Sequence, residues 1–145
     1  MSQENVELVR LLLPQPELDL AALFGNDDFW QIVESLFAPM AHPDFECAAY
    51  RLLGQDKTYA GIDGMRELWL DWLTPWATYR AEIEDVIDLG DQVLVLGRSF
   101  GRLEGGTNEV VIVYAELWTV RDGKIIRYEG YPDRSEALKA VGLEA

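Results

Sequence analysis

The sequence predicts an α+β domain in which helices in the first half of the chain pack against an antiparallel sheet formed mainly by the second half. The 145 residues are close to the commonest size of a single domain, so residues 1–145 are expected to form one domain. Up to residue 76, apolar residues recur mainly every three or four positions, as on helices. From residue 78 onward, four long strand-like runs are joined by short turns that contain glycine.

Three helices are expected at the start of the chain. After the capping residue Ser2, apolar residues continue at helical spacing until Pro14, which cannot donate to the hydrogen-bond ladder. A short second helix is expected over residues 16–24, because it begins with a proline and is followed by a glycine. A third helix is expected to start at Asn26 or Asp27, and the short connections predict that the three pack locally.

A strand and the most regular helix of the chain follow. Residues 44–53 partly alternate and are predicted to form a strand, with a turn over 54–57. The helix begins near Ile62, and Pro75 ends it. Its apolar stripe includes Trp69 and Trp72, which either belong to a plain core or line a ligand cavity.

The second half of the chain predicts an antiparallel meander and a closing helix. Each joint between strands carries the turn residues that tight hairpins require. After the last strand, a capping box at Asp133 and a terminating Gly142 predict a short helix. The expected strands span 78–89, 91–104, 107–121 and 123–131.

The third of these strands has unusual residues on both faces. One face is aliphatic and comprises Val111, Val113, Ala115 and Leu117. The other face places an acid between aromatic residues and comprises Ile112, Tyr114, Glu116 and Trp118. A sheet face in water would carry polar residues, so both faces are expected to be covered. We expect the helices to cover the face with Glu116, and a second copy of the chain to cover the aliphatic face in a twofold homodimer.

Charge and composition exclude several classes of function. The chain has 12 basic and 26 acidic residues, a net charge of −14, which disfavours nucleic acid and anionic membrane surfaces as partners. One cysteine, Cys47, and one histidine, His42, cannot furnish a structural zinc site, and we expect no bound metal. No glycine-rich phosphate loop is present, so no nucleotide cofactor is expected. Without a signal-like start or a long apolar run, the protein is predicted to be cytoplasmic.

Four segments stand out as a set, namely SQENVELVR at 2–10, GIDGMREL at 61–68, AELWTVRDGKII at 115–126 and YPDR at 131–134. Together they resemble the SnoaL-like branch of the nuclear transport factor 2-like superfamily, and the first of them is similar to bacterial members. The resemblance implies a cone-shaped, cystatin-like α+β barrel of the ketosteroid isomerase type. In this fold a curved antiparallel sheet wraps around the helices and encloses an apolar pocket, commonly in a homodimer.

At the positions that resemble catalytic positions of characterised enzymes with this fold, most of the catalytic residues are replaced here by others. The positions that resemble those of ketosteroid isomerase hold Ala49, Leu12 and Glu116, so only the last keeps an acid. The positions that resemble those of limonene epoxide hydrolase hold Arg98, Phe100 and Gly130, so only the arginine remains. Scytalone dehydratase uses histidines in its pocket. The one histidine here, His42, precedes the first predicted strand and is expected to lie outside the pocket, so this chemistry is not expected.

Glu116 and Arg98 are therefore the predicted catalytic pair. If the hairpin near residue 105 has a three-residue loop, these two side chains lie together on the inner face. Glu116 then acts as general acid or base and Arg98 orients it or binds an oxyanion, or the two form only a structural ion pair. The predicted substrate-binding residues are aromatic, and we expect a cavity of roughly 300–1,000 Å³ around them. They are Trp69, Trp72, Phe100, Tyr114, Trp118 and Tyr128.

Two functions follow from this sequence. The first is a cofactor-independent isomerase, cyclase, dehydratase or hydrolase that acts on a small apolar molecule, with Glu116 as the acid or base. The second is a protein without catalytic activity that binds a hydrophobic ligand or serves as a dimeric scaffold. Empty catalytic positions favour the second function, and the retained inward acid favours the first.

Overall fold

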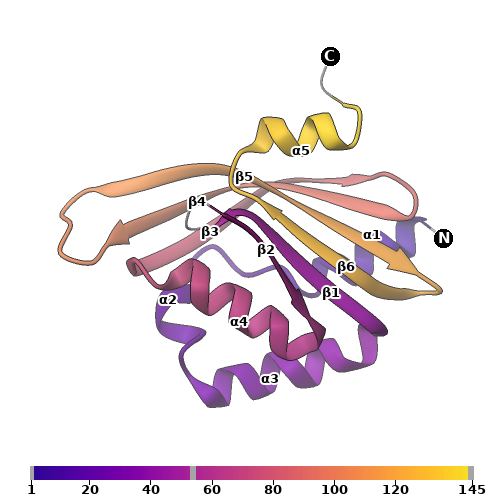
Figure 1. The fold of residues 1–145 in the computed structure, drawn as a ribbon, viewed down its shortest axis with the longest axis horizontal. Coiled ribbons are helices and arrows are strands. Elements are labelled where there is room, and N and C mark those ends of the chain that lie inside the picture. The colour runs from indigo at the N-terminus through magenta and orange to yellow at the C-terminus, as the bar shows by residue number, and fades with distance from the viewer. Residues whose placement is uncertain (1, 53–54, 144–145) are drawn as a thin grey trace.

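The computed structural model, which describes residues 2–52 and 55–143, has one six-stranded sheet with helices on both faces (Figure 1). The elements in chain order are α1 (Ser2–Arg10), α2 (Leu20–Leu23), α3 (Asp27–Phe37), the 3-10 turn η1 (Ala38–Met40), β1 (Ala41–Leu52), β2 (Gln55–Ala60), α4 (Gly61–Leu73), β3 (Trp76–Asp88), β4 (Gln92–Leu103), β5 (Glu109–Arg121), β6 (Lys124–Tyr131) and α5 (Arg134–Ala140). This arrangement confirms the predicted α+β class.

The first two helices are shorter than the sequence predicts. α1 ends at Arg10 and residues 11 and 12 form a turn, because the residue that precedes Pro14 disfavours helical backbone. α2 begins only at Leu20, where the Asp19 side chain accepts a hydrogen bond from the backbone N–H of Ala21. For α3 the Asn26 cap is confirmed.

The sheet is mixed rather than wholly antiparallel. Its strand order is β2-β1-β6-β5-β4-β3, and all neighbours are antiparallel except β1 and β6. The meander β3 to β6 returns to the edge of β1, and there the last strand runs in the same direction as the first. This pairing begins at Ala41, so β1 starts earlier than predicted. Residues 53 and 54, where the predicted strand ends and its turn begins, lie outside the described residues.

The two faces of the sheet are covered by different helices. We call the face toward α1–α4 the inner face and the face toward α5 the outer face (Figure 1). On the outer face, α5 packs Ala137 over Ala115 and Leu117 of β5. The side chain of Arg134 holds α5 in place, because it donates hydrogen bonds to the backbone oxygens of Gly97 and Tyr114.

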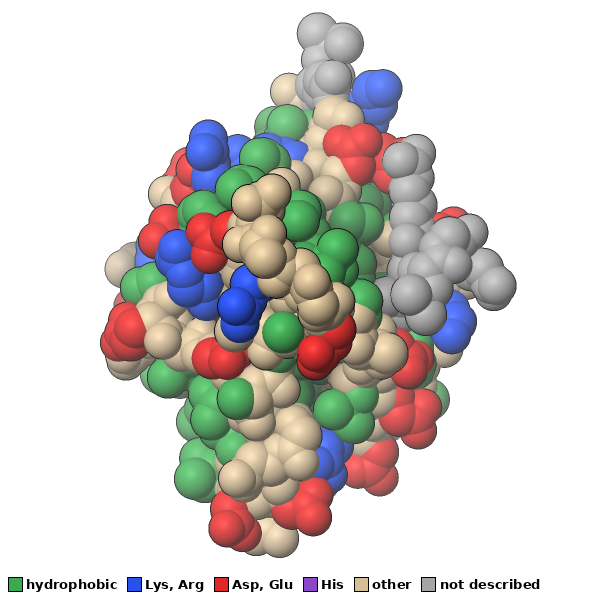
Figure 2. All heavy atoms as spheres, turned by 90° about the vertical axis from the view of Figure 1, so that its left-hand side faces the viewer, with side chains coloured by type: hydrophobic (Ala, Val, Ile, Leu, Met, Phe, Trp, Pro, Cys, Tyr) green, Lys and Arg blue, Asp and Glu red, His purple; other side chains and the backbone are tan. Residues whose placement is uncertain are grey.

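The sequence suggested that a second copy of the chain covers the whole aliphatic face of β5. In the structure only part of this face is available for such a contact. α5 covers its C-terminal half because the chain turns back over the sheet after β6. Val111 and Val113, in the first half of β5, remain 50% and 41% exposed. The β4–β5 hairpin itself extends beyond the helices (Figure 1). Figure 2 looks onto this end of the molecule and shows hydrophobic side chains among the charged ones.

Among the described residues, no helix is long and apolar enough to cross a membrane.

Candidate functional site

A cavity of about 60 Å³ lies between the inner face of the sheet and α4. It is smaller than the expected volume, and large aromatic side chains form much of its lining. Residues from the N-terminal loop, β1, α4, β3, β5 and β6 line it. They are Pro14, Ala49, Tyr50, Leu68, Trp69, Trp72, Tyr79, Ala81, Tyr114, Ala115, Glu116, Tyr128, Gly130, Tyr131 and Pro132.

Small residues on the inner face provide the room for this cavity. Ala49 on β1 is in register with Gly130 on β6, and Gly130 is in register with Glu116 on β5. Because neither neighbour has a long side chain, the carboxyl group of Glu116 has space on this side. A Cβ at position 130 would lie 3.3 Å from the hydroxyl oxygen of Tyr128. This glycine therefore lets Tyr128 reach across toward Glu116.

Glu116 is a buried carboxyl group with one strong hydrogen bond. Its residue is 7% exposed, and the hydroxyl of Tyr128 donates to its Oε2 atom at 2.7 Å. Burial raises the pKa of Glu116 from 4.5 to about 7, and the hydrogen bond from Tyr128 opposes part of this rise. A carboxyl group with such a pKa can donate or accept a proton near neutral pH.

The tyrosine hydroxyls around Glu116 stay protonated. Burial, followed by the charge of Glu116, raises the pKa of Tyr128 and of Tyr114 well above the usual value. Burial also raises the pKa of Tyr79 to about 12. These hydroxyls can therefore donate hydrogen bonds to Glu116 or to a ligand over the whole physiological pH range.

Aromatic contacts hold the sides of the cavity in place. The rings of Trp118 and Tyr128 meet edge to face, with centroids 4.7 Å apart. Trp72 on α4 meets Tyr79 on β3 in the same way at 6.3 Å, and Trp69 stacks on Phe24 at 5.2 Å.

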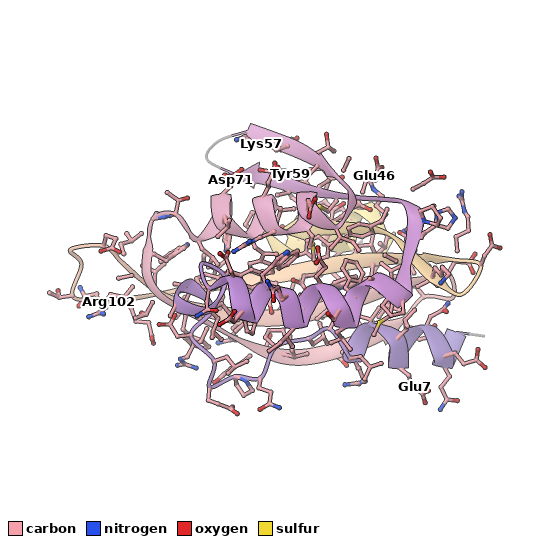
Figure 3. All side chains as sticks on the ribbon, turned by 90° about the horizontal axis from the view of Figure 1, so that it is seen from below. Glu7, Glu46, Lys57, Tyr59, Asp71 and Arg102 are labelled. Atoms are coloured by element: carbon pink, nitrogen blue, oxygen red, sulfur yellow. The ribbon has the colours of Figure 1, made fainter. Side chains whose placement is uncertain are left out.

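The helix that covers the cavity is anchored to the sheet. Figure 3 shows Tyr59 and Lys57 of β2 beside Asp71 of α4. The hydroxyl of Tyr59 donates to Asp71 Oδ2 at 2.5 Å, and Lys57 Nζ lies 3.9 Å from the same oxygen. At Gly64 the helix approaches so closely that a Cβ would lie 2.9 Å from the Cβ of Tyr59. These contacts orient α4 with Leu68, Trp69 and Trp72 on the cavity side.

Five of the predicted site residues come together at the cavity, namely Glu116, Trp69, Trp72, Tyr114 and Tyr128. Trp118 does not line it; its ring belongs to the buried core and packs edge to face against Tyr128.

Arg98 and Phe100 are on the outer face, so the predicted Arg98–Glu116 pair is wrong. Arg98 is opposite Val113 and Glu116 is opposite Val95, a register that puts the two side chains on different faces. The cause is the hairpin, whose last pair is Arg102 with Glu109: it leaves six residues between them, and an even number shifts the register by one residue relative to the expected three-residue loop. Arg98 is 51% exposed and its Nε lies 3.0 Å from Glu84 Oε2.

Phe100 makes a different contact from the one expected. It is opposite Arg80 of β3, whose guanidinium lies 4.2 Å from the centre of its ring. This is a cation–π contact near the surface rather than a wall of the cavity.

Tyr79 and Ala81 line the cavity but were not predicted from the sequence. Tyr79 and Ala81 alternate with outward residues on β3. This alternation would have identified them from the sequence once one face of β3 had been assigned to the inside. The backbone N–H of Tyr79 donates to Asp19, which ties α2 to the strand beside the cavity. Ala49 and Gly130, at positions that resemble catalytic positions of this fold, both line the cavity and are in register with each other.

In the part of the chain that the structure describes, no group of three or more His, Cys, Asp or Glu side chains is arranged so that it could hold a metal ion. Cys47 is buried, and burial raises the pKa of its thiol to about 12, so it behaves as a small apolar residue.

Comparisons with known proteins agree with this architecture. Residues 19–128 match the SnoaL-like domain. TerC co-crystallized with polyporic acid is 25% identical, with a TM-score of 0.62, and the match covers 95% of this chain and 97% of TerC. A search of curated proteins found no match.

Two further solved structures share the fold at lower identity. An NTF2-like protein of unknown function from Burkholderia pseudomallei is 18% identical with a TM-score of 0.63, over 95% of this chain and 97% of that one. A candidate SnoaL-like polyketide cyclase from Jannaschia has the same identity and TM-score, over 99% of this chain and 94% of that one. These two likenesses support the cone fold.

Proposed function

Because the chain belongs to the SnoaL-like domain family, we propose that it binds a small, largely apolar molecule in the cavity beneath α4, and that Glu116 exchanges a proton with this molecule. The observation that carries the proposal is the position of Glu116, a buried carboxyl group that lines the cavity with a pKa of about 7. A site built to bind apolar surface alone would not need a buried acid, because burying such a group costs free energy.

The proposed chemistry needs one acid–base group and no cofactor. Isomerisation, cyclisation, dehydration and hydrolysis can each proceed by moving a proton to or from a bound molecule. Tyr128, which already donates to Glu116, would stabilise its ionised form when the proton has left. The crystal structure of TerC with polyporic acid supports a small molecule as the ligand of such a fold.

A second candidate function is binding without catalysis, and the size of the cavity favours it. A volume of about 60 Å³ accepts only part of a ring-containing molecule unless side chains move. With Arg98 on the outer face, the cavity also lacks the oxyanion-binding partner that the sequence suggested for Glu116.

Binding itself can be tested with tryptophan fluorescence. We expect small apolar molecules to quench the emission saturably, because Trp69 and Trp72 line the cavity. The variant Trp72→Phe should lose the part of the ligand-dependent change that Trp72 contributes, and Trp69 should report the rest. Trp76→Phe is the matched control, since Trp76 lies over Gly101 outside the cavity lining and its loss should leave the change in place. A wild-type protein whose emission no small molecule alters would refute the proposal.

We also propose that two copies of the chain associate through the exposed outer face of β5. Val111 and Val113 are apolar, adjacent on one face, and left uncovered by α5. Val113→Lys should therefore yield monomers or aggregates in analytical ultracentrifugation, because it places a charge in the contact. Val110→Lys, on the opposite face of the same strand, should leave the dimer intact. Sedimentation of the wild type as a monomer at micromolar concentration would contradict this expectation.

A further inference from the structure

We propose that the cavity beside Glu116 receives a small organic ammonium group, such as the tetrahedral head of a quaternary or tertiary amine. This inference rests on the proposed binding function and adds to it the charge of the ligand. Three properties of the lining residues support it: their formal charge, their aromatic character and the volume that they leave.

The charge of the lining favours a cation. Glu116 is the single formally charged side chain among the described residues that line the cavity, and none of them is Lys, Arg or His. An anionic ligand would be buried beside this carboxyl group without a positive partner, at a large cost in desolvation and repulsion. A cation would instead find its counter-charge in the ionised form of Glu116.

Aromatic rings supply the second property. We call Trp69, Trp72, Tyr79, Tyr114 and Tyr128 the aromatic cage, because all of them line the cavity around Glu116. The faces of such rings carry negative electrostatic potential and attract ammonium groups, most strongly when water is excluded. An aromatic cage that also contains a carboxyl group attracts a cation more than it attracts a neutral molecule of the same shape.

The volume matches a group of this size. Because one water-sized sphere needs roughly 10–15 Å³, the cavity of about 60 Å³ accepts about five non-hydrogen atoms. Tetramethylammonium has this number of atoms, and tert-butanol has the same number in the same tetrahedral arrangement without a charge. The two compounds therefore form a matched pair of probes.

Glu116 is the group whose ionisation would control the binding. The titratable residues that line the cavity with it are Tyr50, Tyr79, Tyr114, Tyr128 and Tyr131, and burial raises the pKa of all five, so their hydroxyls stay neutral between pH 5 and pH 8. Tyr50 and Tyr131 donate hydrogen bonds to the carboxylate of Glu129, which does not line the cavity. The other elements that pack around it contribute Val95 from β4, Leu68 from α4 and Ala49 from β1, none of which is ionisable. A bound cation would thus favour the ionised form of Glu116, and the proton that Glu116 loses would pass to solvent.

The experiment compares both probes by NMR titration of the full chain at pH 5 and pH 8. Because the ionised carboxyl group attracts the cation and the neutral one does not, the affinity for tetramethylammonium should rise by about tenfold or more between these values, up to about 100-fold for a pKa of about 7. The affinity for tert-butanol should change little. Chemical shifts of the Trp69 and Trp72 indoles would report binding in the cavity rather than on the acidic surface.

Two variants separate the cavity from the surface charge. Glu116→Gln should weaken tetramethylammonium binding at pH 8 by about tenfold or more and remove its pH dependence, while tert-butanol still binds. Glu109→Gln makes the same change at an exposed position on the same strand and should behave as the wild type. Binding of both probes with equal affinity and no pH dependence would overturn this inference and leave the proposed function standing. Failure of both probes to bind at either pH would overturn the proposed function as well.

Discussion

Replacing Glu116 with Gln is expected to lower turnover of the bound molecule by about 100-fold or more, the scale associated with loss of a general acid or base. Gln has nearly the same shape as Glu and can still accept a hydrogen bond from Tyr128, but it cannot exchange a proton at neutral pH. The fold and the cavity should therefore persist while the proton transfer is lost. The measurement is the steady-state rate of the variant against the wild type, with folding checked by circular dichroism.

The control for this experiment is Glu109→Gln, which makes the same substitution on β5 at a solvent-exposed position. It should retain the wild-type rate. A Glu116→Gln protein that folds, binds and turns over as fast as the wild type would show that Glu116 only accommodates the hydroxyl of Tyr128. In that case binding without catalysis would become the better description of the protein.

The same substitution should change how stability depends on pH. Below about pH 4.5, Glu116 is protonated in both the folded and the unfolded chain. Between pH 4.5 and about 7 the unfolded chain loses this proton and the folded protein keeps it, so the unfolded state gains stability. Because the pKa of Glu116 is higher in the folded protein, its titration should reduce the free energy of unfolding by about 3 kcal/mol over this window. Above pH 7 the carboxyl group is ionised in both states and the difference stays constant.

Urea denaturation at several pH values would measure this effect. The difference in unfolding free energy between Glu116→Gln and wild type should increase in favour of the variant from pH 4.5 to 7. Glu109→Gln should follow the wild-type curve. Parallel curves for Glu116→Gln and wild type would mean that Glu116 titrates alike in both states, and would remove the basis for a neutral buried acid.

The types and order of most elements were predictable because they depend on local patterns, but β2 was not, since residues 55–57 of the predicted turn belong to this strand. Asn26 and Asp133 cap helices that the sequence predicted, and the residues that predicted hairpins do connect β3 to β6. The inward orientation of Glu116 was also predictable, because side chains alternate along a strand and its neighbours on that face are apolar. These features need no knowledge of distant parts of the chain.

Errors arose where two segments had to be aligned. The assignment of Arg98 and Phe100 to the inner face depended on the loop length of one hairpin, and a register that differs by one residue moves every side chain of the strand to the other face. The parallel pairing of β1 with β6 was likewise not visible, because no local pattern states which strand lies beside which.

Local patterns in the chain are enough to specify an α+β domain with a carboxyl group, Glu116, directed toward a set of aromatic residues. What surrounds that group depends on the assembled fold. The fold placed Gly130 and Ala49 beside Glu116, brought the hydroxyl of Tyr128 to 2.7 Å, and put Arg98 on the other face. Strand periodicity is a property of neighbouring residues, whereas the pKa and the partners of a buried group depend on the register between strands that are far apart in the chain.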